Sequence, residues 1–396
     1  MTRNKLMIFV PSLSGGGAER VASTLSIYAP SSIEISFVLL RGKISYPVKY
    51  IIFLLEYPTN RRELIKSLIR FAKLLRSQKP GRVLFFGKLG MLDYFMTVSS
   101  GISHTVLRVQ NYNFEKFVRG SLRHLVTRLR ERLVLRFFVD EFIVISKPIK
   151  SKLSRKYGIP ENRISVIYNP CDTSLISKLA YEKIEEKILE LFSHQVIINV
   201  GRLVRAKGQW HLIRAFKNVS KEVPDARLVI LGEGVLKNYL EKLISGLNLK
   251  DKVFLLGWRS NPFKYMARST LFCFPSLWEG FPNAIIEALA CGLPVMSADC
   301  LSGPREILAP GTRYKVYHLK KPEYAEYGIL MPVMDGKFYP ASDPLTWQEE
   351  IWAEEIIRCL THPEKLSDYR AKAVSRARDF DAEKITKRYF EVLLKE

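Results

Sequence analysis

Short apolar runs alternate with helical segments twice along this chain, and this double alternation constrains its fold more than any other feature. The first series opens with an apolar run over 5–10, a glycine turn over 12–17 and a helix over 18–28. A strand, a glycine turn and a helix begin a doubly wound α/β half with parallel strands. Later strands of this half are expected at about 35–40, 83–86, 105–109, 141–145 and 164–168.

The second series predicts another sheet. A chain of 396 residues is too long for one ordinary core, so two domains of about 150 to 200 residues are expected. The second half should hold its own parallel sheet. Its strands are expected at 196–200, 227–231, 253–256, 271–274 and 294–297, with a linker at 171–190, an irregular insertion at 312–345, and final helices over 347–378 and 382–394.

The segment from Glu279 to Val295 places one carboxylate before a helix and a second inside it. Pro282 suits the first helical turn, and Gly292 suits the residue just after the helix end. The pattern therefore predicts a helix over 282–291, followed by a buried strand.

The start of this helix is a candidate phosphate site. Its free backbone N–H groups would face the loop from Gly280 to Asn283, and such groups bind a diphosphate. Glu287, one turn further in, has two oxygens that suit the cis hydroxyls of a ribose. Glu279 and Glu287 are eight residues apart, a spacing that also occurs in ordinary amphipathic helices. The spacing alone is a weak signal, and the whole string is a stronger one.

Four further motifs stand in a fixed order around this segment. Together with it they resemble the retaining glycosyltransferases of family 4, enzymes of the two-domain GT-B fold, over most of the chain. The motifs are Gly15-Gly-Gly-Ala-Glu-Arg20, Asn199-Val-Gly-Arg-Leu-Val-Arg-Ala-Lys-Gly208, Leu231-Gly-Glu-Gly234 and Gly303-Pro-Arg-Glu-Ile307.

The resemblance implies an α/β architecture of two Rossmann-like domains with parallel sheets and a cleft between them. Residues 1–172 would form the acceptor-binding domain, and residues 173–378 the nucleotide-sugar-binding domain. Residues 379–396 would form a final helix that crosses back to the first domain.

Arg202 and Lys207 flank the turn after the first strand of the second half, at the carboxyl end where open α/β sheets bind ligands. The resemblance implies that both contact the donor pyrophosphate and offset the charge that grows on it. By pattern alone they also fit two solvated surface cations. The donor-binding residues that the resemblance implies are Gly16, Gly17, Arg202, Lys207, Gly280, Phe281, Pro282, Asn283 and Glu287.

Glu279 corresponds to the first glutamate of the family's pair, which lies beside the donor sugar. The implied role is to orient the sugar and stabilise positive charge, and not to attack as a nucleophile. In the front-face mechanism proposed for such enzymes the leaving diphosphate takes the acceptor's proton, so the paired carboxylates of glycosidases are not needed.

The first half departs from the family at one place. Many members carry a histidine after the fourth or fifth strand, beside the sugar. Here the strand over 105–109 leads into Gln110-Asn111-Tyr112 without a histidine. Arg108, Gln110 or Asn111 are candidates for sugar or acceptor contacts in its place, and each also fits a plain loop residue. The glycines at 15–17 allow close backbone approach to a ligand, and also fit a simple flexible turn.

No metal site or disulfide framework is expected. The Asp-x-Asp pair Asp379 and Asp381 lies away from every candidate residue, and the six histidines do not cluster. Five scattered cysteines without a CxxC pair argue against a disulfide framework or a structural zinc and favour a reducing cytosol. No apolar segment approaches the roughly 20 residues that span a bilayer.

The net charge of +23 lies mostly in the first half. Residues 1–172 carry 29 Lys and Arg against 11 Asp and Glu, whereas residues 173–396 carry 33 against 28. The stretch 117–138 reads as a basic amphipathic helix able to lie on an anionic bilayer, and equally as a sheet-packed helix with a solvated basic face. The candidate membrane residues are Arg119, Arg123, Arg128, Arg130, Arg132 and Arg136.

The sequence thus predicts a retaining, metal-independent transferase that uses a nucleotide sugar as substrate and no further cofactor. The donor is expected to be a UDP-hexose or UDP-N-acetylhexosamine, and the acceptor a polyprenyl-diphosphate-linked glycan at the cytoplasmic membrane face. Transfer to a soluble or lipopolysaccharide-core acceptor is the alternative within enzymes. A basic nucleic-acid-binding protein and an inactive partner protein are alternatives of other classes, although no RNP or zinc-finger signature is present.

Overall fold

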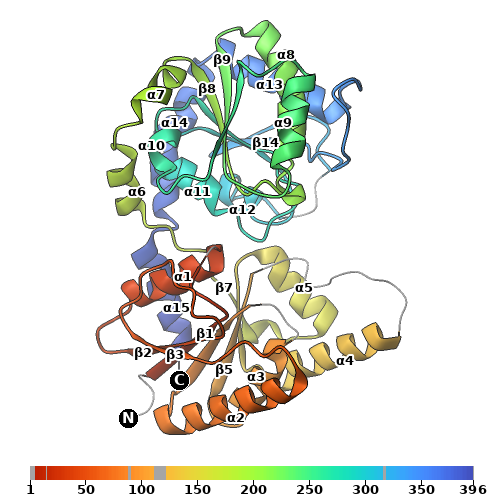
Figure 1. Cartoon of the computed structure of the whole chain (residues 1–396). Helices are drawn as coiled ribbons and strands as arrows, with labels where there is room; N and C mark the ends of the chain where they lie inside the picture. Colours follow the sequence, from red (N-terminus) through yellow and green to blue (C-terminus); the bar gives the residue numbers. More distant parts are fainter. Residues whose placement is uncertain (1–4, 15, 88–90, 111–121, 315–317, 396) are drawn as a thin grey trace. The chain divides into compact units, whose positions relative to one another are not determined.

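The computed structural model describes residues 5–14, 16–87, 91–110, 122–314 and 318–395 (Figure 1). Contacts divide the chain into two units. Unit 1 comprises Met1–Pro170 with Ala382–Glu396, and unit 2 comprises Cys171–Asp381.

Unit 1 contains a parallel sheet whose described strands follow the order β3-β2-β1-β4-β5-β6-β7. The order reverses between β1 and β4, as in doubly wound folds. The strands are β1 (Lys5–Val10), β2 (Glu34–Leu39), β3 (Ile51–Leu54), β4 (Arg82–Phe86), β5 (His104–Val109), β6 (Glu141–Val144) and β7 (Ile164–Val166).

Helices cover both faces of this sheet. On one face, Phe9 and Phe85 pack with Phe71 and Phe95 of the helices α2 and α3. On the other face, α1 and α15 complete a core with β1 and β2. The helices are α1 (Gly17–Ile27), α2 (Arg61–Gln78), α3 (Met91–Ser100), α4 (Leu122–Phe137), α5 (Lys147–Tyr157) and α15 (Ala382–Leu393).

The helix α15 is an integral part of unit 1 although it follows unit 2 in the sequence. Its apolar stripe Ile385, Tyr389, Phe390 and Leu393 is buried in the core of unit 1. Such a stripe at helical spacing stabilises a helix mainly by packing.

Unit 2 contains a second sheet, whose described strands follow the order β10-β9-β8-β11-β12-β14-β13. Its pairings are parallel apart from the antiparallel pair of β13 and β14. The strands are β8 (Gln195–Val200), β9 (Ala226–Leu231), β10 (Val253–Gly257), β11 (Leu271–Phe274), β12 (Val295–Ala298), β13 (Glu323–Ala325) and β14 (Gly328–Met331).

Two groups of helices accompany this sheet. One group consists of α8 with α13 and α9, and the other of α11 with α14 and α6, which also contacts α10. The helices are α6 (Thr173–Ala180), α7 (Glu186–Leu189), α8 (Gln209–Glu222), α9 (Lys237–Gly246), α10 (Phe263–Met266), α11 (Asn283–Ala290), α12 (Pro304–Leu308), α13 (Trp347–Thr361) and α14 (Glu364–Arg378).

The structure corrects three expectations. The segment 312–345 is not wholly irregular, because it contributes β13 and β14 to the sheet. The helix expected over 347–378 is two helices, since α13 ends at Thr361 and Pro363 caps the start of α14 at Glu364. The edge strand β3 was not expected. No described helix is both long and apolar enough to cross a membrane.

Candidate active site

The topology of unit 2 indicates where a ligand would be expected to bind. The strand β8 pairs with β9 on one side and β11 on the other, so the strand order reverses between β8 and β11. Ligands of open α/β sheets bind at such a reversal, outside the carboxyl ends of the strands. Lys207 follows β8, and Glu279 follows β11.

The turn after β8 is closely packed and depends on glycine. Gly208 has a φ of +62°, and a Cβ there would clash with the carbonyl oxygen of Pro275. The aliphatic stem of Lys207 lies over Gly201, because a Cβ on Gly201 would be 3.5 Å from its Cδ and Cε. Gly232 also lies directly against the backbone of Gly201. These close approaches fix the base of the Lys207 side chain.

The loop after β11 is held by the segment that follows β12. The backbone N–H of Glu279 donates to Leu301 O at 2.9 Å, and the N–H of Ser302 donates to Glu279 O at 3.0 Å. The hydroxyl of Ser302 donates to Gly280 O at 2.6 Å. Gly303, with a φ of +106°, leaves no room for a Cβ beside Pro282. These contacts therefore hold the backbone of Glu279 in place and so limit where its carboxylate can lie.

The two loops bring Lys207 and Glu279 into contact. Lys207 Nζ lies 2.6 Å from Glu279 Oε1, and the two side chains are 18% and 13% exposed. The ammonium also lies 5.0 Å from the centroid of the Phe274 ring. A cation and a carboxylate are thus fixed at the reversal of the strand order. Arg202, on the same turn as Lys207, has an exposed side chain.

The helix α11 carries the second glutamate. It begins at Asn283 with Pro282 as the capping residue, so Pro282 lies just before the helix and not in its first turn. Phe281 is buried against Phe380, with ring centroids 5.7 Å apart. Glu287 lies in the second turn and is 7% exposed. Gly292 has a φ of +70° after the helix end, where such a residue is expected.

A buried cysteine, Cys300, lies near the charged pair. Burial raises the pKa of the Cys300 thiol well above its ordinary value, and Glu279 raises this pKa further, while Lys207 opposes both. The thiol is therefore protonated at neutral pH and is not a nucleophile here.

In unit 1 the predicted glycines lie at the start of α1. Gly16 caps the helix in an extended conformation, and Gly17 is its first residue. The carboxylate of Glu19 lies directly against Gly16, where a Cβ would meet its oxygen. An acidic group is favourable at a helix N-terminus. The donor contact of Gly16 and Gly17 stays a prediction.

Arg108 lies at the carboxyl end of β5 and is 1% exposed. Its Nε donates to Tyr389 Oη at 2.8 Å, one terminal nitrogen to Gln110 Oε1 at 3.1 Å, and the other to Asn169 Oδ1. A buried guanidinium with these partners links α15 to the sheet of unit 1. Its contact with a sugar or an acceptor stays a prediction, as does that of Gln110.

Some predicted residues lie outside the described part of the chain. Asn111 and Arg119 are among them, and only the backbone is described at Arg123 and Arg128. On α4, Arg132 and Arg136 are exposed. Arg130 donates to Tyr94 Oη at 2.7 Å.

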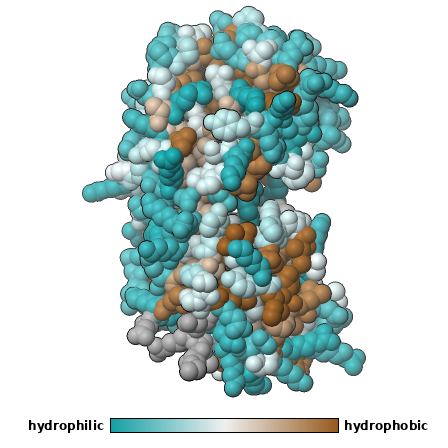
Figure 2. Space-filling view, turned by 90° about the vertical axis from the view of Figure 1, so that its left-hand side faces the viewer, coloured by the Kyte–Doolittle hydropathy of each residue, from teal (hydrophilic) through white to brown (hydrophobic). Residues whose placement is uncertain are grey.

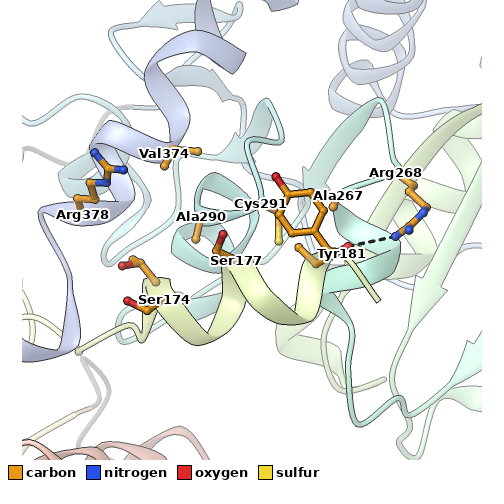
Figure 3. A pocket seen from close by; sticks show the side chains of 11 residues that line it. Ser174, Ser177, Tyr181, Ala267, Arg268, Ala290, Cys291, Val374 and Arg378 are labelled. Atoms are coloured by element: carbon orange, nitrogen blue, oxygen red, sulfur yellow. Dashed lines mark hydrogen bonds between the residues drawn. The ribbon is translucent and has the colours of Figure 1, made fainter. Parts of the chain in front are cut away.

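A pocket of about 770 Å³ opens elsewhere on unit 2 (Figure 3). Ser174, Ser177 and Tyr181 line it from α6 and the residue after it, opposite Ala290 and Cys291 at the far end of α11. None of the predicted donor residues lines this pocket, so its size does not make it the candidate site.

In the part of the chain that the structure describes, no group of three or more His, Cys, Asp or Glu side chains is placed to hold a metal ion. Of the Asp-x-Asp pair, Asp381 accepts a hydrogen bond from Thr173 Oγ1.

The sequence interpretation missed the residues that support the site. Ser302 and Gly303 hold the Glu279 loop, and Arg305 bridges Asp299 and Glu323 with five hydrogen bonds of 2.7–3.1 Å. The string Gly303-Pro-Arg-Glu-Ile was noted only as a motif. Its glycine before proline is the signal of a tight turn that could have indicated this role.

Comparisons with known proteins identify the family of this chain. The family model described as Glycosyltransferase Family 4 matches residues 15–175, and the one described as Glycosyl transferases group 1 matches residues 181–327. An uncharacterized glycosyltransferase of Methanocaldococcus jannaschii is 34% identical over 83% of this chain and 82% of its own length. The chain belongs to the family 4 glycosyltransferases.

This glycosyltransferase is also similar to a Campylobacter jejuni enzyme along almost its whole length. That protein, N-acetylgalactosamine-N,N'-diacetylbacillosaminyl-diphospho-undecaprenol 4-alpha-N-acetylgalactosaminyltransferase, is 30% identical over 98% of this chain and 99% of its own. Among solved structures, Anabaena HepE in complex with UDP matches with a TM-score of 0.74 and 20% identity, covering 98% of this chain and 99% of that one. The fold is GT-B, and the enzyme is a hexosyltransferase.

Proposed function

We propose that this enzyme transfers a hexose or N-acetylhexosamine from a UDP sugar to a polyprenyl-diphosphate-linked glycan, with retention and without a metal ion. The contact between Lys207 and Glu279 at the strand reversal of unit 2 carries the proposal. The Campylobacter relative's name describes a diphospho-undecaprenol-linked acceptor and N-acetylgalactosamine transfer, and the HepE structure holds UDP.

Each residue has a separate role in the proposed reaction. Lys207 and Arg202 bind the diphosphate and offset the negative charge that grows as the bond from the anomeric carbon to the phosphate oxygen breaks. Glu279 orients the sugar and stabilises positive charge at that carbon. Glu287 accepts hydrogen bonds from the ribose hydroxyls. These two cations perform the charge stabilisation for which other transferases use a metal ion.

The acceptor attacks from the face that the diphosphate leaves. Its hydroxyl oxygen forms the new bond to the anomeric carbon, and the hydroxyl proton moves to the departing phosphate oxygen. No protein nucleophile is required, because both new bonds form between the substrates.

The exposed face of α4 supports a position at an anionic membrane surface. Leu129, Leu133 and Phe137 are 58%, 44% and 67% exposed and recur every four residues, so they share one stripe. Arg132 and Arg136 lie next to this stripe. An exposed apolar stripe beside arginines favours a helix at a lipid interface over one packed on the sheet with only cations exposed. We place the enzyme at the cytoplasmic face of the cell membrane.

A donor and acceptor screen tests the proposal. Product formation is measured with several UDP and GDP sugars, and a polyprenyl-diphosphate glycan competes with a soluble glycan. We expect the best rate with a UDP sugar and the lipid-linked acceptor, with the anomeric configuration retained in the product. Preference for the soluble glycan would favour the alternative acceptor class, and an inverted product would contradict the mechanism.

A further inference from the structure

The helix α2 of unit 1 has an unusual solvent-facing surface. It buries Ser67, Phe71 and Leu75, which fix the side that faces the sheet. On the opposite side, Ile65 and Ile69 are each 53% exposed. These two residues are one helical turn apart, so their side chains are neighbours. A folded protein gains nothing in its own stability from leaving this branched pair in water.

The cations of α2 surround the isoleucine pair. By the helical repeat, the arc that contains Ile65 and Ile69 also carries Arg61, Arg62, Lys66, Lys73 and Arg76, without an acidic residue. Glu63, the one acidic residue of α2, lies in the first turn of the helix. Its carboxylate accepts hydrogen bonds from the N–H and the hydroxyl of Thr59, both at 2.7 Å. Arg70 lies outside the arc and pairs with Glu56 at 3.5 Å.

Exposed apolar side chains of unit 1 also occur outside α2. The edge strand β3 has no described partner on its outer side, and its Ile51 and Leu54 are 65% and 57% exposed. Figure 2 shows brown side chains gathered at the right of the lower half, so apolar side chains are exposed on one face of this unit. Exposed apolar surface on this scale marks an interaction site.

The helices α2, α3 and α4 lie side by side, because α3 contacts both of its neighbours. Tyr94 of α3 is 40% exposed, and the guanidinium of Arg130 lies 4.9 Å from its ring centroid. The stripe of α4 and the isoleucine pair of α2 are thus parts of one helical layer in which cations alternate with exposed apolar or aromatic groups.

We infer that α2 docks on an anionic bilayer, with Ile65 and Ile69 inserted among the acyl chains and its cations at the headgroups. This inference deepens the membrane part of the proposed function and rests on it. Charge complementarity selects the occupant: a cationic arc attracts an anionic lipid surface, whereas it repels the same arc on a second copy of the chain. An apolar pair at its centre favours lipid over nucleic acid, which is bound mainly through phosphate contacts.

Insertion of the isoleucines should make binding partly independent of salt. Electrostatic attraction is screened over about 3 Å at 1 M salt, but apolar burial is not. The double variant Ile65→Ser with Ile69→Ser removes the apolar part and keeps every charge. Its matched control is Leu175→Ser with Leu189→Ser, two leucines of unit 2 that are 48% and 50% exposed.

Co-sedimentation of the full chain with phosphatidylglycerol–phosphatidylcholine vesicles at about 0.1 M and 1 M salt tests the inference. We expect the parent and the control to keep part of their binding at 1 M, and the double variant to bind at least tenfold more weakly there. Parental binding by the double variant at both salt concentrations would overturn it. The inference would also be overturned if the parent formed a dimer in ultracentrifugation, and the double variant lost this dimer but bound vesicles as the parent does.

Activity separates this inference from the proposed function. With acceptor in vesicles, the double variant should show a raised KM, whereas its kcat and its UDP affinity should equal those of the parent. If the parent itself forms no product from the lipid-linked acceptor, the proposed acceptor is wrong whatever the vesicle result. If product forms but vesicle binding does not depend on Ile65 and Ile69, only the assignment of α2 fails.

Discussion

Lys207 Nζ and Glu279 Oε1 lie 2.6 Å apart, although 72 residues separate them in the chain. In this contact the ammonium and the carboxylate compensate each other's charge. When the donor binds, we expect the ammonium of Lys207 to contact the diphosphate in place of Glu279. Glu279 would then be free to contact the sugar, and the ion pair would serve to preorganise both side chains.

Replacing either cation should slow the reaction strongly. We expect Lys207→Ala or Arg202→Ala to lower turnover by about a hundredfold or more, the scale of losing one preorganised partner of a developing oxyanion. Lys221 is an exposed cation at the end of α8, and the control variant Lys221→Ala should leave turnover unchanged. If turnover stays within a factor of three of the parent's and stability is unchanged, the substituted residue is not part of the active site.

Replacing Glu279 and replacing Glu287 should impair different steps of the reaction. Glu287→Ala should weaken the binding of free UDP, because the ribose hydroxyls lose their acceptor. Glu279→Ala should mainly slow transfer from an intact donor, since its proposed contact is the sugar. Calorimetric titration with UDP and steady-state rates on both variants check this. UDP affinity equal to that of the parent in Glu287→Ala would refute the ribose assignment.

Reversal of charge on α4 should weaken the binding of the enzyme to anionic vesicles. We expect Arg132→Glu with Arg136→Glu to lower co-sedimentation at low salt and activity on lipid-linked acceptor, yet to spare UDP binding. Several cations near an anionic leaflet contribute roughly 1 kcal/mol each, so reversing two has a large effect. Lys242→Glu with Lys250→Glu, exposed in unit 2, is the matched control. Sedimentation equal to that of the parent would show that the arginines of α4 only face solvent.

A buried charge cluster in unit 2 should make its stability depend on pH. His211, Arg214 and Glu349 are 0% exposed, and Glu349 Oε1 lies 2.7 Å from His211 Nδ1 and 2.9 Å from Arg214 Nε. Burial raises the pKa of Glu349, but hydrogen bonds from His211 and Arg214 outweigh it and hold the pKa below its ordinary 4.5. A depressed pKa stabilises the fold above the unfolded-state pKa, and this contribution is lost as the pH falls through the folded-state value.

Glu349→Gln should therefore lower the free energy of unfolding most at neutral pH, and its difference from the parent should shrink below about pH 4.5. Glu349→Ala should cost about 3–5 kcal/mol at pH 7, because it leaves a buried guanidinium without its carboxylate. Urea unfolding at several pH values measures both. Glu354→Gln, exposed on the same helix, is the control, and an equally pH-dependent loss there would contradict the assignment.

Local patterns predicted the parallel strands and the start of each half, because buried strands and glycine turns leave clear periodic signals. The strands β3, β13 and β14 were missed because they lie in segments rich in Tyr, Lys and Pro, which favour an irregular structure locally. The helix over 282–291 was correct in place and one residue too long at each end, because Pro282 and Cys291 are caps.

The site was predictable as a set of motifs, and its contacts were not. Local sequence patterns contain no information that Lys207 meets Glu279, since that depends on the strand order of unit 2. Arg108 illustrates the same limit. Its neighbours in the sequence suggest a cation at the end of a strand that could contact a ligand. In the structure, its guanidinium is hydrogen-bonded to Tyr389, which follows 281 residues later in the chain. Long-range packing decides which polar groups remain available.

The place of α15 in unit 1 has a consequence for synthesis of the chain. The ribosome makes residues 1–170 first, but Ile385, Tyr389, Phe390 and Leu393 leave it only after the whole of unit 2. Until then the nascent unit 1 exposes the apolar surface that α15 will cover, and Arg108 lacks its bond to Tyr389. Unit 2 is continuous and can fold while it emerges, so the half of the enzyme that is translated first is the half that matures last.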